Sequence, residues 1–579
     1  MSAGLPPRRD EAVSWAALAA LAAFSLWAGL QLAHPLFDHD AWFHLKSGQL
    51  LWRLKRFPPQ SLFSYVPGGD QWLKASWLYD LLAWGLYRSL GLPDLILARV
   101  LLGLASLALV LDLALRRGAG LAQALACCSA ALLATRFFWT ERPQVFAFFF
   151  FAWLLWFLGR PAGRARLAGI FLASALWSNF HGSAVLAPAL VALFEAGAWL
   201  EDPGPGSRRP ALAALGAAFL GSLCNPQLGG QYAALARLSS VQAAVIARVN
   251  EWRAPAWGTD PWFFAMVLAL ALGLFPAWRG RRRAALPLLL ALAGLGLYTR
   301  RLIPFFCLAG AAYLPAWFSP PRWRAGRWLV AGLALAWLAQ SVLLFRGPLA
   351  PFLGADLSDC PVGAADFLAA HPPQGRLGNL YDDGAYLIWR LCPRTRVFVD
   401  SRMNFPDSVF QDCRILSDGD PGWREVPAKY GMSCLLVRCF KNPPYTWDSL
   451  GLALALLKDP SWRLAYFDDR YLLFARPGEL AAQKGAWPWY RGVDPIQARI
   501  TRVYPDTLRL LKARLASQGQ DGLGLYLLGL AYLKSGRPGP AGRSFRRCLG
   551  VDPGFLAAGI RLRDLEKAPE LERAQKTRP

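Results

Sequence analysis

The sequence predicts an α-helical polytopic membrane protein with about eleven spans, followed by a soluble α/β domain and a short α-helical segment. Of its 579 residues, 55% are hydrophobic and 17% charged, which is too apolar for one soluble domain of this length. Nearly uncharged stretches of about 20 residues, the length that crosses a bilayer, recur up to Phe345. The composition then changes, and Pro348 and Pro351 mark a linker. The expected domains are 1–345, spanning the membrane; 346–359, the linker; 360–480, the α/β domain; and 500–570, the helical segment.

The apolar stretches define the expected spans, and two amphipathic stretches define helices that lie along the membrane surface. The surface helices cover 41–54 and 76–90, where charges and the Pro58-Pro59 break oppose a continuous crossing. Both belong to an expected large outer loop at 34–93. The expected spans are 12–33, 94–115, 121–139, 144–159, 167–184, 185–200, 211–225, 261–278, 285–299, 302–318 and 328–345.

The net charge of +25 raises the question of nucleic-acid binding, and the positions of the arginines answer it. The basic clusters lie in short gaps between apolar segments, where arginines orient helices by staying in the cytoplasm. This pattern predicts a multi-pass membrane protein with a cytoplasmic N-terminus, an extracytoplasmic C-terminal domain and no nucleic-acid partner. The clusters are Arg8-Arg9, Arg116-Arg117, Arg160 with Arg164 and Arg166, Arg208-Arg209, Arg279 with Arg281 to Arg283, and Arg322 with Arg324 and Arg327.

Ionisable and amide side chains gather at the helix ends on the expected outer face. Such groups are costly beside lipid, so we expect them to line a polar chamber within the bundle. A carboxylate there can deprotonate an acceptor hydroxyl, and arginines can hold a departing phosphate. The simpler alternatives are that Asp38 and Asp40 cap the next helix, and that Arg300 and Arg301 snorkel to the interface. The residues are Asp38, Asp40, His44, Glu141, Asn179, His181, Trp252, Arg300 and Arg301.

The motif Asp38-His39-Asp40-Ala41-Trp42-Phe43-His44-Leu45 follows the first span and precedes two surface helices. This layout resembles the GT-C-type membrane glycosyltransferases, which use polyprenyl-phosphate sugars, over about the first 345 residues. The resemblance implies that Asp40 or Asp38 is the catalytic base and that Glu141 is a second acidic residue of the site. Two features depart from the family: the Asp-Glu pair of the protein mannosyltransferases is Asp-His-Asp here, and a Trp-Trp-Asp-Tyr-Gly signature is absent from the sequence.

The leading hypothesis is a membrane glycosyltransferase that moves a hexosyl group from a polyprenyl-phosphate carrier to an acceptor on the outer face. Asp40 acts as base, and Asp38 and Glu141 order the site. The expected substrate-binding residues are His44, His181, Asn179, Trp252, Arg300 and Arg301. Asp38, Asp40 and His44 are also residue types that bind a divalent cation, and their spacing leaves that question open. The alternative is a non-catalytic membrane scaffold that recruits envelope proteins.

The region after the linker has the pattern of a soluble α/β domain and then of packed helices. Strands are expected at 376–380, 396–400, 434–437 and 464–474, the last with an Asp468-Asp469 turn. The final helical part, around 525–553, resembles a tetratricopeptide repeat that packs on adjacent helices or on a protein partner. One or two disulfides are allowed in an oxidising compartment, among Cys360, Cys392, Cys413, Cys434 and Cys439.

Overall fold

The computed structural model forms two compact units, which are described separately: Met1–Phe57 with Leu73–Asp356, and Pro58–Trp72 with Leu357–Pro579. The described residues are 15–68, 74–204, 207–233, 249–280, 282–318, 326–346, 353–402, 404–439, 449–518 and 521–576. Several residues used above lie outside the described ones, namely Arg8, Arg9, Arg281, Arg322, Arg324, Pro348 and Pro351.

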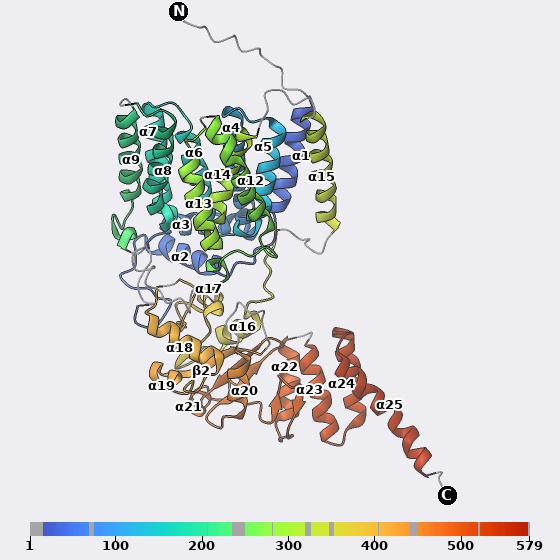
Figure 1. Ribbon diagram of the computed structural model, residues 1–579. Coiled ribbons are helices and arrows are strands. Elements are labelled where there is room, and N and C mark those ends of the chain that lie inside the picture. The colour runs from blue at the N-terminus through green and yellow to red at the C-terminus, as the bar shows by residue number, and fades with distance from the viewer. Residues whose placement is uncertain are drawn as a thin grey trace, which may run out of the picture. The chain divides into compact units, whose positions relative to one another are not determined.

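The first unit is a bundle of helices in which every expected span is helical, so the predicted fold class is confirmed (Figure 1). Among the described residues, five apolar helical stretches are long enough to cross a membrane, and α6, α13 and α15 contain shorter apolar ones. The helices are α1 (Trp15–Leu32), α4 (Leu92–Arg116), α5 (Leu121–Thr135), α6 (Gln144–Leu158), α7 (Arg164–Phe180), α8 (Ala187–Glu201), α9 (Arg208–Leu223), α12 (Pro261–Arg279), α13 (Leu286–Tyr298), α14 (Ile303–Trp317) and α15 (Gly326–Arg346).

Burial distinguishes the centre of the bundle from its outer surface. Every residue of α14 is buried, so this helix is surrounded by the others. Large apolar side chains on outer helices are instead exposed, for example Leu101 of α4, Leu272 of α12 and Leu335 of α15. In water such exposure would be costly, whereas it suits contact with lipid.

Two short helices, α2 (Asp40–Leu54) and α3 (Trp77–Leu90), match the expected surface helices and lie at one end of the bundle (Figure 1). They pack so closely that a Cβ atom added at Gly48 would lie 1.9 Å from the backbone oxygen of Asp80. A residue larger than glycine would therefore push α3 away. This packing fixes the position of α2, which begins at the candidate site residue Asp40.

The second unit contains a four-stranded mixed sheet, as expected for the α/β region. The strand order is β1 (Arg376–Gly378), β2 (Met432–Arg438), β4 (Tyr471–Ala475), β3 (Arg463–Phe467). β1 and β2 are parallel, and the other pairs are antiparallel. Every residue of β4 is buried, so both faces of the sheet are covered. The nearby helices are α16 (Val362–Ala370), α17 (Gly384–Leu391), α18 (Asp407–Asp418), α19 (Glu425–Tyr430), α20 (Leu450–Lys458) and α21 (Pro477–Ala482).

The expected strand at 396–400 was wrong, because its backbone pairs with a segment far away in the chain. Val397 forms a single parallel bridge with Ser64, which lies between α2 and α3 in sequence. The Val397 N–H donates to the oxygen of Phe63 at 2.8 Å, and the Tyr65 N–H donates to the oxygen of Val397 at 3.3 Å. Phe63 and Val66 are buried. The segment Pro58–Trp72 is therefore part of the second unit, although it was expected within one outer loop.

The chain ends in a short two-stranded ribbon and four helices. The ribbon is β5 (Val493–Asp494) with β6 (Arg499–Ile500), and the helices are α22 (Thr507–Gln518), α23 (Gly522–Lys534), α24 (Pro538–Val551) and α25 (Leu556–Lys576). Gly529 of α23 lets the ring of Phe545 from α24 approach closely. The assignment to tetratricopeptide repeats stays a prediction. The ten cysteines all lie among the described residues, and no disulfide joins any two of them there.

Candidate functional site

Four separate chain segments bring charged side chains together in the first unit. Asp38 and Asp40 stand where α1 leads into α2, and Arg142 lies between the 3₁₀ helix η1 (Arg136–Phe138) and α6. Glu251 belongs to the 3₁₀ helix η4 (Asn250–Trp252), and Arg301 belongs to η5 (Arg300–Leu302). None of the five residues lies within an expected span, as a site at a bundle end requires.

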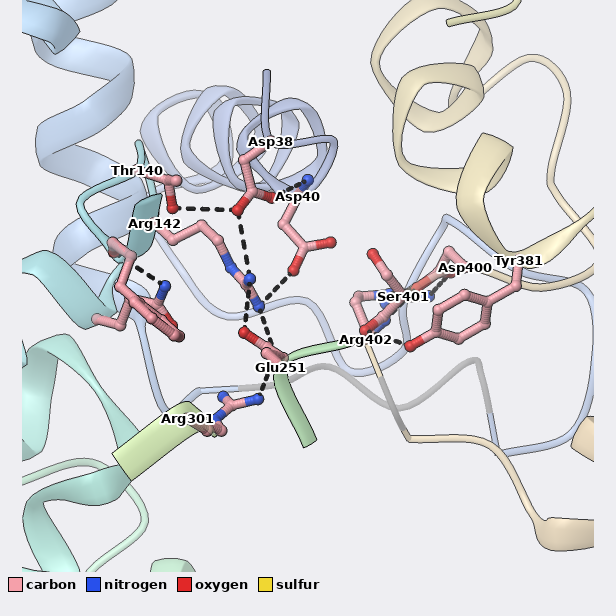
Figure 2. A network of polar contacts seen from close by, with 12 residues as sticks. Asp38, Asp40, Thr140, Arg142, Glu251, Arg301, Tyr381, Asp400, Ser401 and Arg402 are labelled. Atoms are coloured by element: carbon pink, nitrogen blue, oxygen red, sulfur yellow. Dashed lines mark hydrogen bonds and ion pairs between the residues drawn. The ribbon is translucent and has the colours of Figure 1, made fainter. Parts of the chain in front are cut away.

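Arg142 is the centre of this cluster (Figure 2). Its Nη2 lies 2.8 Å from Oδ2 of Asp40, and its Nη1 lies 3.3 Å from Oδ2 of Asp38. The same guanidinium donates to both carboxylate oxygens of Glu251 at 3.3 and 3.5 Å. Burial lowers the pKa of Arg142, but the three carboxylates outweigh this effect and raise it well above the ordinary value. The guanidinium therefore stays charged.

The two aspartates of the motif have different surroundings. Oδ1 of Asp38 accepts the backbone N–H of Asp40 at 3.0 Å, and its Oδ2 accepts the hydroxyl of Thr140 at 3.0 Å. Asp38 thus stabilises the turn into α2 and links it to the Thr140–Arg142 segment. This is a partial form of the expected capping role, because Asp38 lies beside the first residue of α2. Asp40 faces Arg142 with its Oδ2.

Glu251 connects Arg142 to Arg301. Nη1 of Arg301 donates to Oε1 of Glu251 at 2.6 Å, and its guanidinium lies 4.7 Å from the ring centroid of Trp252. Burial alone would raise the pKa of Glu251, but Arg142 and Arg301 lower it to about 2. Glu251 is therefore ionised, and it holds the two cations near each other.

Arg300 and Arg301 were expected to act as a pair, and the structure gives them separate neighbours. Nε and Nη2 of Arg300 donate to Oδ1 of Asp260 at 3.1 and 3.0 Å, and its Nη1 donates to Asn250 at 2.7 Å. Three of its donor groups are thus occupied by the protein. Of these two arginines, Arg301 contacts Glu251, so it is the one that belongs to the Arg142 cluster.

Glu141 points away from this cluster toward α4. Its Oε1 lies 2.7 Å from Nη1 of Arg99, and both side chains are buried. Burial raises the pKa of Glu141 to about 7, although Arg99 opposes the change. Arg99 also donates to His34 at 3.1 Å, and burial together with Arg99 lowers the pKa of that histidine to about 4. Glu141 therefore anchors the segment that carries Arg142.

A small pocket, open to the surface, lies beside this anchor. Apolar side chains of α3, α4 and α6 form most of its wall, and Thr140, Glu141, Arg142 and Arg99 add polar atoms. Such an amphipathic lining suits a ligand with both an apolar and a polar part.

The remaining candidates lie around the same end of the bundle with distinct contacts. Nδ1 of His44 lies 2.7 Å from Oδ1 of Asp80 in α3. His181 hydrogen-bonds through Nδ1 to the hydroxyl of Ser183 at 2.6 Å, and burial, then Arg301 and Arg142, lowers its pKa to about 3. Asn179 has a structural environment: it accepts from the indole of Trp77 at 2.8 Å and donates to the oxygens of Ala175 and Cys224.

Sequence reasoning did not select Arg142, Glu251, Asp80 or Arg99 as site residues. Arg142 and Glu251 had a readable signal, because each is a charge between apolar segments and directly follows or precedes a selected residue. Asp80 and Arg99 lie within helical stretches, where a lone charge on an apolar face indicates a buried partner. The identity of that partner could not be read from the pattern.

The positions of Asp38, Asp40 and His44 show whether the three side chains could bind one divalent cation together. Asp38 and Asp40 converge on the guanidinium of Arg142, while His44 faces Asp80. In the part of the chain that the structure describes, no three His, Cys, Asp or Glu side chains form a group that could hold a metal ion. These three residues are therefore not arranged as one ligand set.

Fold and site together define a polytopic helical membrane protein with a charged cluster between its helices. Neither a family model nor a curated protein matches the chain. Among solved structures, it is similar to ArnT from Cupriavidus metallidurans bound to undecaprenyl phosphate, with 15% identity, 80% of this chain and 98% of that chain covered, and a TM-score of 0.45. The apo state of that protein matches with 14% identity and a TM-score of 0.47, covering 81% of this chain and 98% of that chain. Arabinofuranosyltransferase AftD from Mycobacteria matches with 17% identity and a TM-score of 0.49, covering 80% of this chain and 41% of that chain.

Proposed function

We propose that this chain is a membrane glycosyltransferase that moves a hexosyl group from a polyprenyl phosphate to an acceptor hydroxyl. The observation that carries the proposal is the convergence of Asp38, Asp40 and Glu251 on Arg142, with Arg301 at its edge. The five side chains come from four segments and are 13% to 28% exposed. A charged cluster that solvent reaches, within a lipid-facing bundle, has the features of a substrate chamber.

The reaction assigns separate tasks to the acids and the arginines. The acceptor oxygen forms a bond to the anomeric carbon as Asp40 takes its proton. The bond from that carbon to the phosphate oxygen breaks, and polyprenyl phosphate leaves with the electron pair. Arg142 and Arg301 stabilise the negative charge that develops on this phosphate. Asp38 braces Asp40, and Glu251 keeps the arginines in place.

The pocket beside Glu141 supports a lipid-linked substrate. Its walls are mainly apolar, and its polar atoms include those of Arg142, the centre of the charged cluster. An isoprenoid chain could bind along such walls while its phosphate meets an arginine. The positions of the arginine clusters in the sequence support transfer on the outer face of a bacterial inner membrane.

Purified protein in liposomes, supplied with synthetic polyprenyl phosphates that carry tritiated mannose, glucose or galactose, tests the proposal. Envelope membranes from cells lacking the gene provide the acceptor. Wild type should transfer label from one of these donors. Asp40→Asn should lower the transfer rate about 10³-fold, because the base is lost. Size-exclusion and circular dichroism profiles should be unchanged.

The matched control is Asp112→Asn, which removes a carboxylate that pairs with Arg116 near the other end of α4. This variant should transfer at the wild-type rate. Mass spectrometry of envelope glycans and lipid-linked sugars, with and without the gene, covers donors outside the panel. Full activity of Asp40→Asn would remove the base assignment, and unchanged glycans and lipid-linked sugars would contradict glycosyl transfer.

A further inference from the structure

A histidine and an aspartate form a buried pair between α2 and α3, one helical turn from Asp40. His44 follows Asp40 by four residues, so both side chains lie on the same face of α2. Nδ1 of His44 is 2.7 Å from Oδ1 of Asp80, and the side chains are 8% and 4% exposed. The hydroxyl of Ser76 donates to the same oxygen at 3.4 Å.

The packing of α2 on α3 does not depend on this pair. The backbones already touch at Gly48, and Leu45, Tyr79 and Ala83 are buried apolar residues on these two helices. Burying two ionisable groups costs solvation that a pair of apolar side chains would not lose. A purely structural contact at this position would therefore be made more cheaply by apolar residues.

The second ring nitrogen of His44 is placed to accept a proton. An ionised Asp80 only accepts hydrogen bonds, so Nδ1 carries the proton and Nε2 keeps a lone pair. Within the described residues, Nε2 of His44 takes part in no hydrogen bond. It is also not sealed inside the protein. The ring centroids of Phe43 and Tyr79 lie 4.1 and 5.2 Å from that of His44, and these rings hold the imidazole in place.

The charged cluster next to His44 has no obvious place to keep a proton. Each of its carboxylates is paired with an arginine, and the pKa of Glu251 is lowered to about 2 by Arg142 and Arg301, against the effect of burial. A proton that Asp40 takes from an acceptor must therefore move on for the next reaction. His44 lies one turn away on the same helix.

We propose that His44, oriented and supported by Asp80, receives at Nε2 the proton that the acceptor hydroxyl loses through Asp40. This inference rests on the proposed glycosyl transfer. Asp80 stabilises the imidazolium that forms, as a carboxylate does for a catalytic histidine. The proton passes from Nε2 to solvent after the products leave, which restores neutral His44 and ionised Asp40.

The titratable groups around His44 come from its own helix and from the elements packed against it. Asp80 and Tyr79 face it from α3, and Asp40 lies on its own helix. His181, after α7, also acts on it electrostatically and is uncharged above about pH 3. Asp80 is the carboxylate in direct contact with His44, and burial raises the pKa of Asp80 although His44 and Ser76 oppose the change.

The first test needs no substrate. Nitrogen-15 NMR of full-length protein labelled at its five histidines, with His44→Gln to assign the signal, reports the tautomer and titration of His44. We expect protonated Nδ1 and a lone pair at Nε2 in the neutral form, and a titration that Asp80→Asn moves to lower pH. A His44 signal that does not titrate between pH 5 and 9, or that Asp80→Asn leaves unchanged, would overturn the proposal.

The second test uses whichever tritiated donor wild type accepts. His44→Gln, which removes the proton-accepting ring nitrogen, should lower the single-turnover rate about 10²-fold with little change in donor KM. Asp80→Asn should move the acidic limb of the rate profile to lower pH. His371→Gln, in the second unit, is the control and should match wild type. A wild-type profile in His44→Gln would refute proton transfer, whereas inactivity of wild type with every donor would count against the proposed function instead.

Discussion

The charged cluster of the first unit and the buried ion pair of the second are built in opposite ways. In the second unit, Arg438 donates to Asp383 at 2.8 and 3.1 Å, and the hydroxyl of Tyr471 donates to the same oxygen at 2.9 Å. The Arg438 and Asp383 side chains are 2% and 0% exposed. In the first unit, one arginine faces three carboxylates that remain partly exposed. The first of these networks is shut off from solvent, although Oδ2 of Asp383 accepts no hydrogen bond from the described residues, whereas solvent reaches the charged cluster of the first unit.

A second network of the closed kind supports this distinction (Figure 2). Arg402 donates to both oxygens of Asp400 at 2.7 and 2.8 Å and to the hydroxyl of Ser61 at 3.0 Å. It links the Pro58–Trp72 segment to the rest of the second unit. One cation, one anion and a hydroxyl satisfy each other, as expected for groups that hold a fold together. Burial alone does not mark function; the balance of charges and the access of solvent do.

The largest effect that would separate the two kinds of network is on stability. Arg438→Met should destabilise the second unit by about 3 to 5 kcal/mol, because Asp383 remains buried without its cation. Arg470→Met is the control, since Arg470 and Asp359 form an exposed pair that contributes about 0 to 1 kcal/mol. Denaturant unfolding and limited proteolysis measure both. Equal stability of the two variants would break the comparison.

Loss of a buried apolar side chain from the Pro58–Trp72 segment should destabilise the second unit about as much as loss of Arg438. Phe63 is 1% exposed, and Phe63→Ala should cost about 3 to 5 kcal/mol by leaving a cavity. Gln60→Ala, at an exposed position of the same segment, should have an effect within about 0.5 kcal/mol. Unfolding of the second unit, followed by proteolysis of full-length protein, distinguishes them. Wild-type resistance of Phe63→Ala would mean that the segment does not stabilise this unit.

The neighbouring arginines sharpen the comparison within the first unit. Arg301→Ala should lower transfer from the accepted donor about 10- to 100-fold, because one of two phosphate-facing cations is lost. Arg300→Ala should mainly lower the unfolding temperature, since it leaves Asp260 unpaired. Donor titrations measure the effect of each variant on transfer, and thermal unfolding measures its effect on stability. A larger loss of transfer in Arg300→Ala would reverse the assignment.

The smallest effect concerns pH. His181 has a pKa of about 3 in the folded chain and 6.5 ordinarily, so the unfolded chain binds a proton first as the pH falls below about 6.5. The stabilisation from neutral His181 is complete above pH 6.5 and is lost progressively toward pH 3. His181→Gln should therefore lose less Tm than wild type between pH 7 and pH 5, by about 2 °C. Parallel melting curves would contradict this burial of a neutral imidazole.

Much of the first unit could be predicted from the sequence, because a span is a local property. About 20 apolar residues must form a helix in lipid, and arginine positions tell which ends share a side. Helix bounds such as 94–115, observed as Leu92–Arg116, follow from that rule. The same reasoning selected Asp38, Asp40 and Arg301, because charged groups at helix ends on one side of a membrane are costly beside lipid and therefore tend to gather.

Only the tertiary structure decided which partner each charge has. Arg142 gathers carboxylates from residues 38, 40 and 251, and His44 finds Asp80 36 residues later. The separation of Arg300 from Arg301 and the pairing of Val397 with Ser64 are decisions of the same kind. Hydrophobic period and length describe one segment at a time, whereas ion pairs and backbone bridges depend on how distant segments pack. Sequence thus determined the helices and their polar ends, and packing determined which charged groups meet between them.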